Sequence, residues 1–173
     1  MRDGYELFST NRIAKAAGCS IGSLYQYFPS KEALIAELIE RHTVQMVSIC
    51  RKALEDVATA PLDVAARQTC AAMVAAHAVN PKLSKIFREQ LPRVGKLKRL
   101  NDMHAGTAAM VAVLLKARRA EINVADPDLA AFFIVQGVDA LIHASLDLRA
   151  KGLSDTALVE ELTRFVLGYV QVR

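Results

Sequence analysis

The chain has 173 residues, of which 53% are hydrophobic and only 6% are aromatic. This length accommodates one sizeable core or a small head on a larger body, and apolar content made mainly of Ala, Leu and Val favours close helix packing over sheet. The longest largely apolar stretch, Ala105 to Leu115, is too short to span a bilayer, and the N-terminus lacks the apolar segment of a signal peptide. We therefore expect an all-α, soluble, cytoplasmic protein that does not use a membrane.

The net charge of +4 is unevenly distributed. Residues 1–42 carry five basic and five acidic side chains, residues 82–119 carry ten basic against two acidic ones, and residues 120–173 carry four against eight. The overall charge therefore does not by itself indicate a nucleic-acid partner for the N-terminal segment.

Catalytic and metal-binding motifs are absent from the sequence. The three cysteines, Cys19, Cys50 and Cys70, match no zinc or CxxC spacing, so small buried thiols are expected. The four histidines show no HExxH or ExxH spacing, and there is no Gly-rich phosphate loop or nucleophile motif. We expect no enzymatic activity, no cofactor and no metal site.

Two short helices are predicted near the N-terminus. The first spans residues 10–17, after which Gly18 permits the left-handed backbone of a tight turn. Ser20 can then cap a second helix that reaches Phe28. Three residues separate the two helices.

A long third helix follows Pro29 and is capped by Ser30. Its apolar positions recur at steps of three, four and seven residues to about Ala58, which indicates one continuously buried face. Those positions are Ile35, Leu38, Ile39, Met46, Ile49, Cys50, Ala53 and Val57. Further boundaries fall at Pro61, Pro81, Pro92, Pro127 and Gly152. The pattern predicts about eight helices and no convincing strand.

The two short helices have the features of a helix-turn-helix. Ala14 allows the second helix to pack closely, Gly18 permits the turn, and the segment Ser20–Phe28 is polar on one side. The inner face would be formed by Ile13, Cys19, Leu24 and Phe28. An ordinary αα-hairpin has the same spacing and remains the alternative at this point.

The segment TNRIAKAAGCSIGSLYQYFPSKEAL, Thr10 to Leu34, resembles the signature of the TetR family of transcriptional regulators. The resemblance implies an N-terminal helix-turn-helix DNA-binding domain over residues 1–46 and a helical ligand-binding and dimerisation domain over residues 47–173. It also implies a homodimer that binds a double-stranded DNA operator and acts as a repressor released by a small, hydrophobic effector. The alternative is a helical dimer of the same type that binds a ligand or partner protein but does not bind DNA tightly.

The resemblance also implies which side chains contact DNA. Those facing the major groove would be Ile21, Gly22, Ser23, Gln26 and Tyr27, and those touching phosphates would be Thr10, Asn11, Tyr25 and Lys31. Gln26 can both donate and accept a hydrogen bond on a base edge, and Lys31 at a helix start suits a phosphate oxygen. Gly22 has no side chain with which to read a base and would instead allow close backbone approach. The two tyrosines fit a core position equally well.

Members of the resembling family carry a complete helix before the Gly-Tyr that stands here as Gly4-Tyr5, and only three residues precede it. We therefore expect the first helix of the head to be largely absent and a native product that begins upstream of Met1. The side chains expected to be left partly uncovered are Ile13, Leu24, Phe28 and Ile35. The alternatives are that Tyr5, Leu7 and Phe8 cover the gap, or that this form no longer reads DNA.

A polar stripe interrupts the apolar helix expected over residues 129–148. Gln136, Asp139, His143 and Asp147 recur at steps of three, four and four residues. Three interpretations remain open: a solvated edge, a hydrogen-bonded stripe between subunits, or the polar lining of a ligand pocket.

Flexible and aromatic side chains of the central helices are candidates for the pocket lining. They are Met73, His77, Phe87, Met103, His104, Met110, Phe132 and Phe133, joined by Gln136 and His143 from the stripe. The effector is expected to be hydrophobic, and its identity is not readable from the sequence.

The last two helices are expected to form a four-helix bundle with those of a second copy. The interface candidates are Phe165, Val166 and Tyr169, while the mid-helix Gly137 and Gly168 would allow close helix crossing. The alternative is that these helices cover only the core of their own subunit.

Overall fold

The computed structural model describes residues 9–79, 97–149 and 151–171. Within these ranges it contains seven helices and, between helices, an isolated antiparallel bridge that joins Ile122 to Gln171. The helices are α2 (Thr10–Ala16), α3 (Ile21–Tyr27), α4 (Lys31–Asp56), α5 (Leu62–Ala78), α7 (Leu97–Ala117), α8 (Pro127–Arg149) and α9 (Asp155–Val170). The prediction of an all-α fold is confirmed.

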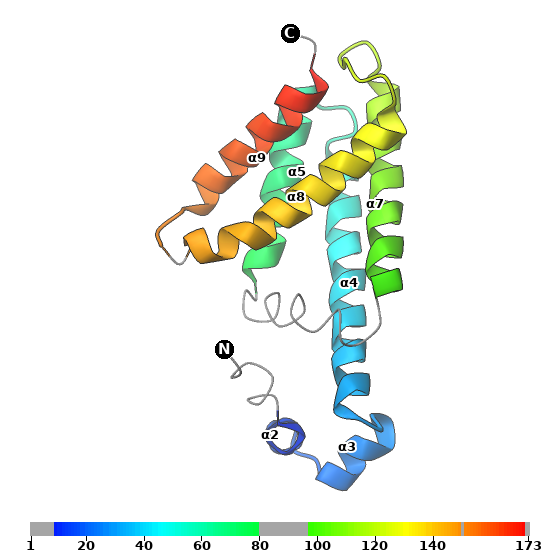
Figure 1. Cartoon of the computed structure of the whole chain (residues 1–173), viewed down its shortest axis with the longest axis vertical. Coiled ribbons are helices and arrows are strands. Elements are labelled where there is room, and N and C mark those ends of the chain that lie inside the picture. Colours follow the sequence, from blue (N-terminus) through cyan, green and yellow to red (C-terminus); the bar gives the residue numbers. More distant parts are fainter. Residues whose placement is uncertain (1–8, 80–96, 150, 172–173) are drawn as a thin grey trace.

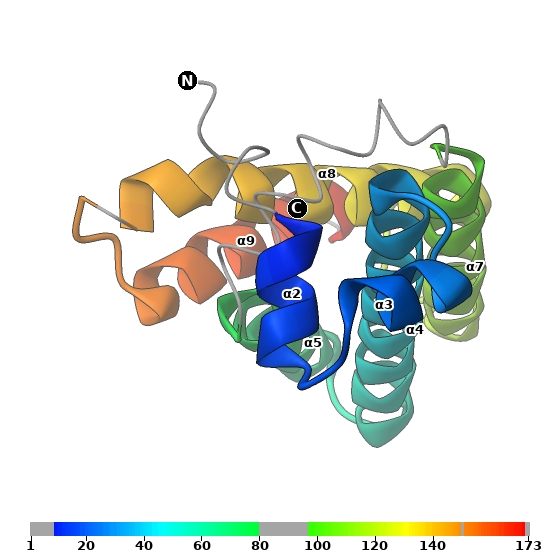
Figure 2. The ribbon, with the colours of Figure 1, turned by 90° about the horizontal axis from the view of Figure 1, so that it is seen from below.

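The molecule consists of a small head and a larger body joined by one helix (Figure 1). The head comprises α2, α3 and the first turns of α4, and α4 continues from it into the body, where it contacts α5 and α7. The last two helices cover α5 and α7, with α8 packed against α7 and α9 packed against α5. Seen from the head end, α8 and α9 extend to one side beyond α2 and α3 (Figure 2).

The helix boundaries of the head follow from local backbone chemistry. Gly18 has a φ of +67°, a left-handed conformation that glycine adopts at little energetic cost because it has no Cβ. The hydroxyl of Ser20 accepts a hydrogen bond from the Ser23 N–H at 3.0 Å, and that of Ser30 accepts one from the Ala33 N–H at 3.1 Å. The predicted turn and both predicted caps are therefore confirmed.

The head has its own small hydrophobic cluster. Ala14, Leu24 and Leu34 are buried there, and Ile13, Phe28 and Leu38 pack against them. The expectation of an uncovered apolar face is wrong for Leu24 and Ile35, which are 8% and 1% exposed, while Ile13 and Phe28 are half-buried. Cys19 is exposed, so its predicted place on the inner face and as a buried thiol is also wrong. It follows the turn glycine directly and therefore lies outside both helices. The residues expected to precede the head lie outside the described ranges.

The end of α4 is fixed to the end of α7 by a buried arginine. The Arg118 Nη2 donates to the backbone carbonyl oxygens of Val57 and Ala58, each at 3.0 Å, and to that of Ala60 at 2.5 Å. These carbonyls lie at the end of α4 and just beyond it, where a cation is favoured by the helix dipole, and the Val57 carbonyl also accepts a hydrogen bond from the Ala60 N–H at 3.1 Å. The far end of α4 is therefore held within the body.

α8 has two apolar faces. One contributes Ala130, Ala131 and Ile142, each 0% exposed, to the core of the body. By length and composition the segment Pro127–Leu146 could cross a membrane, and 33% of it is buried inside the fold. The part that joins the core accounts for some of this apolar composition, and the exposed apolar face is described below.

Candidate functional site

The residues predicted to contact DNA lie on the surface of the head around α3. Those exposed are Asn11, Ile21, Gly22, Tyr25, Gln26 and Tyr27, whereas Thr10, Ser23 and Lys31 are half-buried. The Thr10 hydroxyl and the Tyr25 hydroxyl are 3.3 Å apart and join α2 to α3. Tyr27 is 80% exposed, so the core alternative considered for it does not hold. The structure thus brings all nine residues to one end of the molecule.

A second exposed feature is apolar and lies on α8 and α9. We call it the α8/α9 face, and it consists of Leu129, Phe132, Phe133, Leu141, Leu148, Phe165 and Tyr169. The Phe133 ring lies edge-on to the Tyr169 ring with centroids 6.4 Å apart, which ties the two helices together. A Cβ at Gly137 would lie 3.0 Å from the Phe165 ring, so this glycine permits the close crossing that the sequence indicated.

The three predicted interface residues differ in how exposed they are in the single chain. Phe165 and Tyr169 are 43% and 42% exposed on the α8/α9 face, whereas Val166 is 8% exposed and packs in the core of its own chain. Apart from its chain neighbours and the backbone of its own helix, a Cβ at Gly168 would have no atom of the described residues within 4 Å in the single chain.

A cavity of about 530 Å³ lies inside the body, between α4, α5, α7 and α8. Its walls are mainly apolar, with Leu54 and Met46 from α4 and Val111 and Leu115 from α7 among them. A volume of roughly 300–1,000 Å³ with apolar walls and a few polar groups is typical of small-molecule sites.

The predicted pocket residues divide into those that line this cavity and those that do not. Met73, His77, Met103, His104 and His143 line it. Met110 packs against the body core, Gln136 is half-buried elsewhere on α8, and Phe132 and Phe133 belong to the α8/α9 face. Phe87 lies outside the described residues.

All four histidines of the chain line one part of the cavity, together with one carboxylate. We call this the histidine cluster, which consists of His42 on α4, His77 on α5, His104 on α7, and Asp139 and His143 on α8. His77 is in the last turn of α5, and α5 ends and α7 begins on the side of the body that faces the head (Figure 1). The cluster therefore joins four helices near the head.

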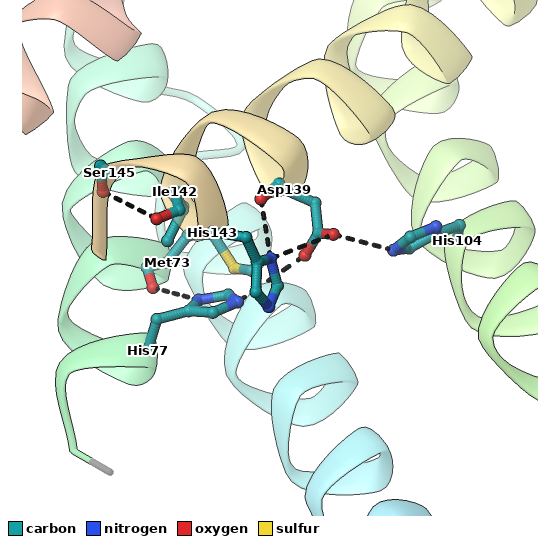
Figure 3. A network of polar contacts seen from close by, with 7 residues as sticks. All are labelled: Met73, His77, His104, Asp139, Ile142, His143 and Ser145. Atoms are coloured by element: carbon teal, nitrogen blue, oxygen red, sulfur yellow. Dashed lines mark hydrogen bonds and ion pairs between the residues drawn. The ribbon is translucent and has the colours of Figure 1, made fainter. Parts of the chain in front are cut away.

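Asp139 is the centre of the cluster (Figure 3). Its carboxylate oxygens lie 3.7 Å from the His77 Nε2, 3.6 Å from the His104 Nε2 and 3.4 Å from the His143 Nδ1. The His77 Nδ1 lies 2.8 Å from the Met73 carbonyl oxygen, and the His77 and His143 rings meet edge-to-face with centroids 5.0 Å apart.

Burial and charge act in opposite directions on Asp139. Burial raises its pKa, but polar contacts with His143 and His77 and the charges of His143 and His104 outweigh burial and hold the pKa well below its usual range. Burial lowers the pKa of His42, and the charges of His77 and His143 lower it further. The site therefore favours an ionised carboxylate and a neutral His42.

The sequence indicated only part of this cluster. Asp139 and His143 stood out as a step of four on the polar stripe, and the pocket alternative is the one their placement favours. Gln136 does not line the cavity, and the side chain of Asp147 lies outside the described residues. No sequence pattern indicated His42, because its partners are remote in the chain.

Two family models match the chain. The model described as "Bacterial regulatory proteins, tetR family" matches residues 1–38, and the model described as "Tetracyclin repressor-like, C-terminal domain" matches residues 61–169. The chain belongs to the TetR family of transcriptional regulators. Family and fold are those of transcriptional regulators, which are not enzymes.

Curated relatives of this TetR-family regulator match it over part of their length. An uncharacterized HTH-type transcriptional regulator of Mycobacterium tuberculosis is 34% identical over 119 residues, which are 68% of this chain and 54% of that protein. The nucleoid occlusion factor SlmA of Actinobacillus pleuropneumoniae is 54% identical over 39 residues, or 22% of this chain and 19% of SlmA. The chain therefore matches about a fifth of the length of the SlmA proteins.

Solved structures match over nearly the whole chain. A TetR-family transcriptional regulator from Mesorhizobium loti superposes with a TM-score of 0.70 at 19% identity, covering 95% of this chain and 87% of its own. The flavonoid-responsive regulator FrrA superposes with a TM-score of 0.58 at 28% identity, covering 99% of this chain and 90% of its own.

Proposed function

We propose that this TetR-family regulator is a ligand-responsive repressor in the cytoplasm, a homodimer that releases its DNA operator when a small, largely hydrophobic effector occupies the cavity. The supporting observation is that α4 belongs to both regions: Leu34 lies in the head cluster, and Cys50 and Leu54 line the cavity. We place the DNA-binding domain at residues 1–46 and the ligand-binding and dimerisation domain at residues 47–173.

Exposed polar groups on α2 and α3 support the role of the head. Gln26 presents an amide to the groove, and Lys31, at the start of α4, lies where a phosphate oxygen is favoured. In a dimer, two such heads spaced by about 34–36 Å enter successive major grooves on one side of DNA.

The α8/α9 face supports the dimer. It exposes several large apolar side chains in a single chain, and a second copy placed by a two-fold axis would bury the same residues on both subunits. Phe165 and Tyr169 are the interface residues that remain from the sequence prediction.

The cavity supports a largely hydrophobic effector with one polar group. Its apolar walls favour a hydrophobic body of the size that about 530 Å³ holds, and the histidine cluster favours a polar group at one end. FrrA, which superposes on this chain at 28% identity, is described as flavonoid-responsive, and this supports a small-molecule effector for the chain.

Release follows from a difference in affinity. An effector that binds better when α4 is displaced lowers operator affinity by its differential binding to the two states, typically about 1–3 kcal/mol or roughly 5–150-fold.

Titration of DNA from the gene's own upstream region tests the proposal, with and without candidate hydrophobic effectors and with random DNA as control. We expect tight, sequence-specific binding that an effector weakens. The equal numbers of acidic and basic residues over positions 1–42 favour the alternative, a helical dimer that does not bind DNA tightly. Equal affinity for upstream and random DNA would support that alternative and contradict the proposal.

A further inference from the structure

We infer that the histidine cluster is a binding site for one divalent transition ion of the zinc type, held by Asp139 and the histidines around it. His77, Asp139 and His143 each offer a ligand atom, and these atoms all lie within 4.8 Å of one another. His104 approaches the same carboxylate from α7 (Figure 3).

The separations match a tetrahedral site. Ligand atoms about 2.0–2.1 Å from Zn²⁺ lie roughly 3.4 Å from one another at the corners of a tetrahedron. The Asp139 oxygens lie 3.6 Å from the His104 Nε2 and 3.7 Å from the His77 Nε2. The His143 Nδ1 lies 2.8 Å from the Asp139 carbonyl oxygen and so carries a proton, which leaves the His143 Nε2 as its ligand atom.

The hydrogen bond of His77 leaves a ligand atom available. Its Nδ1 lies 2.8 Å from the Met73 carbonyl oxygen, which can only accept, so Nδ1 carries a proton. In the neutral ring the lone pair is then on Nε2, which faces an Asp139 oxygen. Two acceptors then face each other unless a metal ion lies between them or the ring carries a second proton. A ring N–H held by a backbone carbonyl is also the usual support of a metal-binding histidine.

His104 supplies a second, independent observation. Its side chain is 9% exposed, and its Nε2 is buried with no hydrogen-bond partner. The nitrogen points at the Asp139 carboxylate from 3.6 Å, too far for a hydrogen bond. Coordination of an ion between these groups would give this nitrogen a partner.

The donor set selects the class of ion. Imidazole nitrogens with a single carboxylate suit Zn²⁺ and neighbouring transition ions, whereas Mg²⁺ and Ca²⁺ require mainly oxygen ligands. The cluster offers one carboxylate and several imidazoles, and so favours zinc over magnesium.

The ion would also act on the regulator. It would tie the end of α5 to α7 and α8, and both α5 and α7 contact α4, which carries the head. Only this regulatory consequence rests on the proposed function, since metal binding is measured without DNA.

The experiment uses the 173-residue chain, stripped with a chelator and titrated with Zn²⁺ alone against a chromophoric competitor, with metal content measured by mass spectrometry. We expect one Zn²⁺ per chain and, with Co²⁺ instead, the visible absorption of tetrahedral coordination. Asp139→Asn and His77→Gln should each lower affinity by more than the roughly 10–100-fold that loss of a supporting second-layer contact costs.

Asp128→Asn is the matched control, because Asp128 is an exposed carboxylate on the same helix that pairs with Lys116 at 2.7 Å. It should bind Zn²⁺ as the parent does, and excess Mg²⁺ should not compete. Circular dichroism checks that each variant is folded, and His104→Gln replaces any variant that is not. Absence of Zn²⁺ binding, unchanged affinity in folded Asp139→Asn, or equal binding of Mg²⁺ would overturn the inference.

The two proposals fail separately. A chain that binds Zn²⁺ but no operator contradicts the proposed function and leaves the metal site standing. A chain that binds its operator, releases it with an organic effector and binds no Zn²⁺ contradicts the metal site alone.

Discussion

The head draws its proposed DNA contacts from one short stretch of chain, Thr10 to Lys31, held by a turn and two caps. The body draws the histidine cluster from positions as far apart as His42 and His143, brought together by four helices. The head therefore presents a surface that local sequence defines, whereas the site of the body exists only when its helices are packed.

The two regions also differ in how much core supports them. The head cluster has Ala14, Leu24 and Leu34 as its buried members, whereas the body core extends over α4, α5, α7, α8 and α9. A small cluster has little burial to lose, so damage to the head should remain local while damage to the body should affect the whole molecule.

The largest expected effect comes from a charge on the α8/α9 face. Phe165→Glu should yield a folded monomer that has lost tight operator binding, because an unpaired charge buried between subunits costs several kcal/mol. Light scattering and operator titration measure the two effects. Thr156→Glu, an exposed position at the start of α9, should remain dimeric. An intact Phe165→Glu dimer would reject this interface.

Leu24→Ala should separate the stability of the head from that of the body. Deleting this side chain should cost about 2–5 kcal/mol and open the head, while the dimer and the cavity persist. Hydrogen exchange should increase over residues 10–38 and remain unchanged over residues 97–149. Leu162→Ala, 2% exposed in the body core, should instead destabilise the whole chain. Loss of protection everywhere in Leu24→Ala would show that head and body unfold as one unit.

Two substitutions in the head should differ in kind. Gln26→Ala should lose about 1–3 kcal/mol of discrimination at one base pair, whereas Lys31→Ala should weaken all sequences and reduce the salt slope by about one. Titrations on specific and random DNA at several salt concentrations distinguish them. Lys52→Ala, exposed on the part of α4 that lies in the body, is the control and should change neither. Equal losses on both DNAs for the two head variants would contradict these roles.

The smallest expected effect is a difference in alkylation rate between the exposed cysteine of the head and the buried cysteines of the body. Burial raises the pKa of Cys50 to about 11, and it raises that of Cys70 to about 11 against an opposing contact with Thr163. At pH 8 only roughly 0.1% of such a thiol is the reactive thiolate, and the fraction rises tenfold per pH unit. An alkylating reagent followed by peptide mass spectrometry should therefore modify the exposed Cys19 first. Faster modification of Cys50 or Cys70 in the folded chain would contradict their burial.

Several features of the fold were predictable because their causes are local. The left-handed Gly18, the caps Ser20 and Ser30, and the capping of α9 by Ser154 each depend on atoms within a few residues. Helical periodicity likewise predicted that Ile39 and Met46 would be buried on α4.

Other features depended on which faces meet in three dimensions. The sequence analysis named both Phe165 and Val166 as interface residues, and only packing against α8 and the body core left the first exposed and buried the second. Cys19 lay in an apolar pattern but is exposed, because the turn carries it out of both helices.

The sequence by itself determined an all-α chain, a helix-turn-helix with defined ends, and a polar step from Asp139 to His143 on an otherwise apolar helix. Only the tertiary structure decided that this step faces His77 and His104 across a cavity. Caps and periodicity result from interactions within one or two helical turns, whereas the cavity depends on how four helices cross. The residue spacing around a side chain does not show which residues of another helix it contacts.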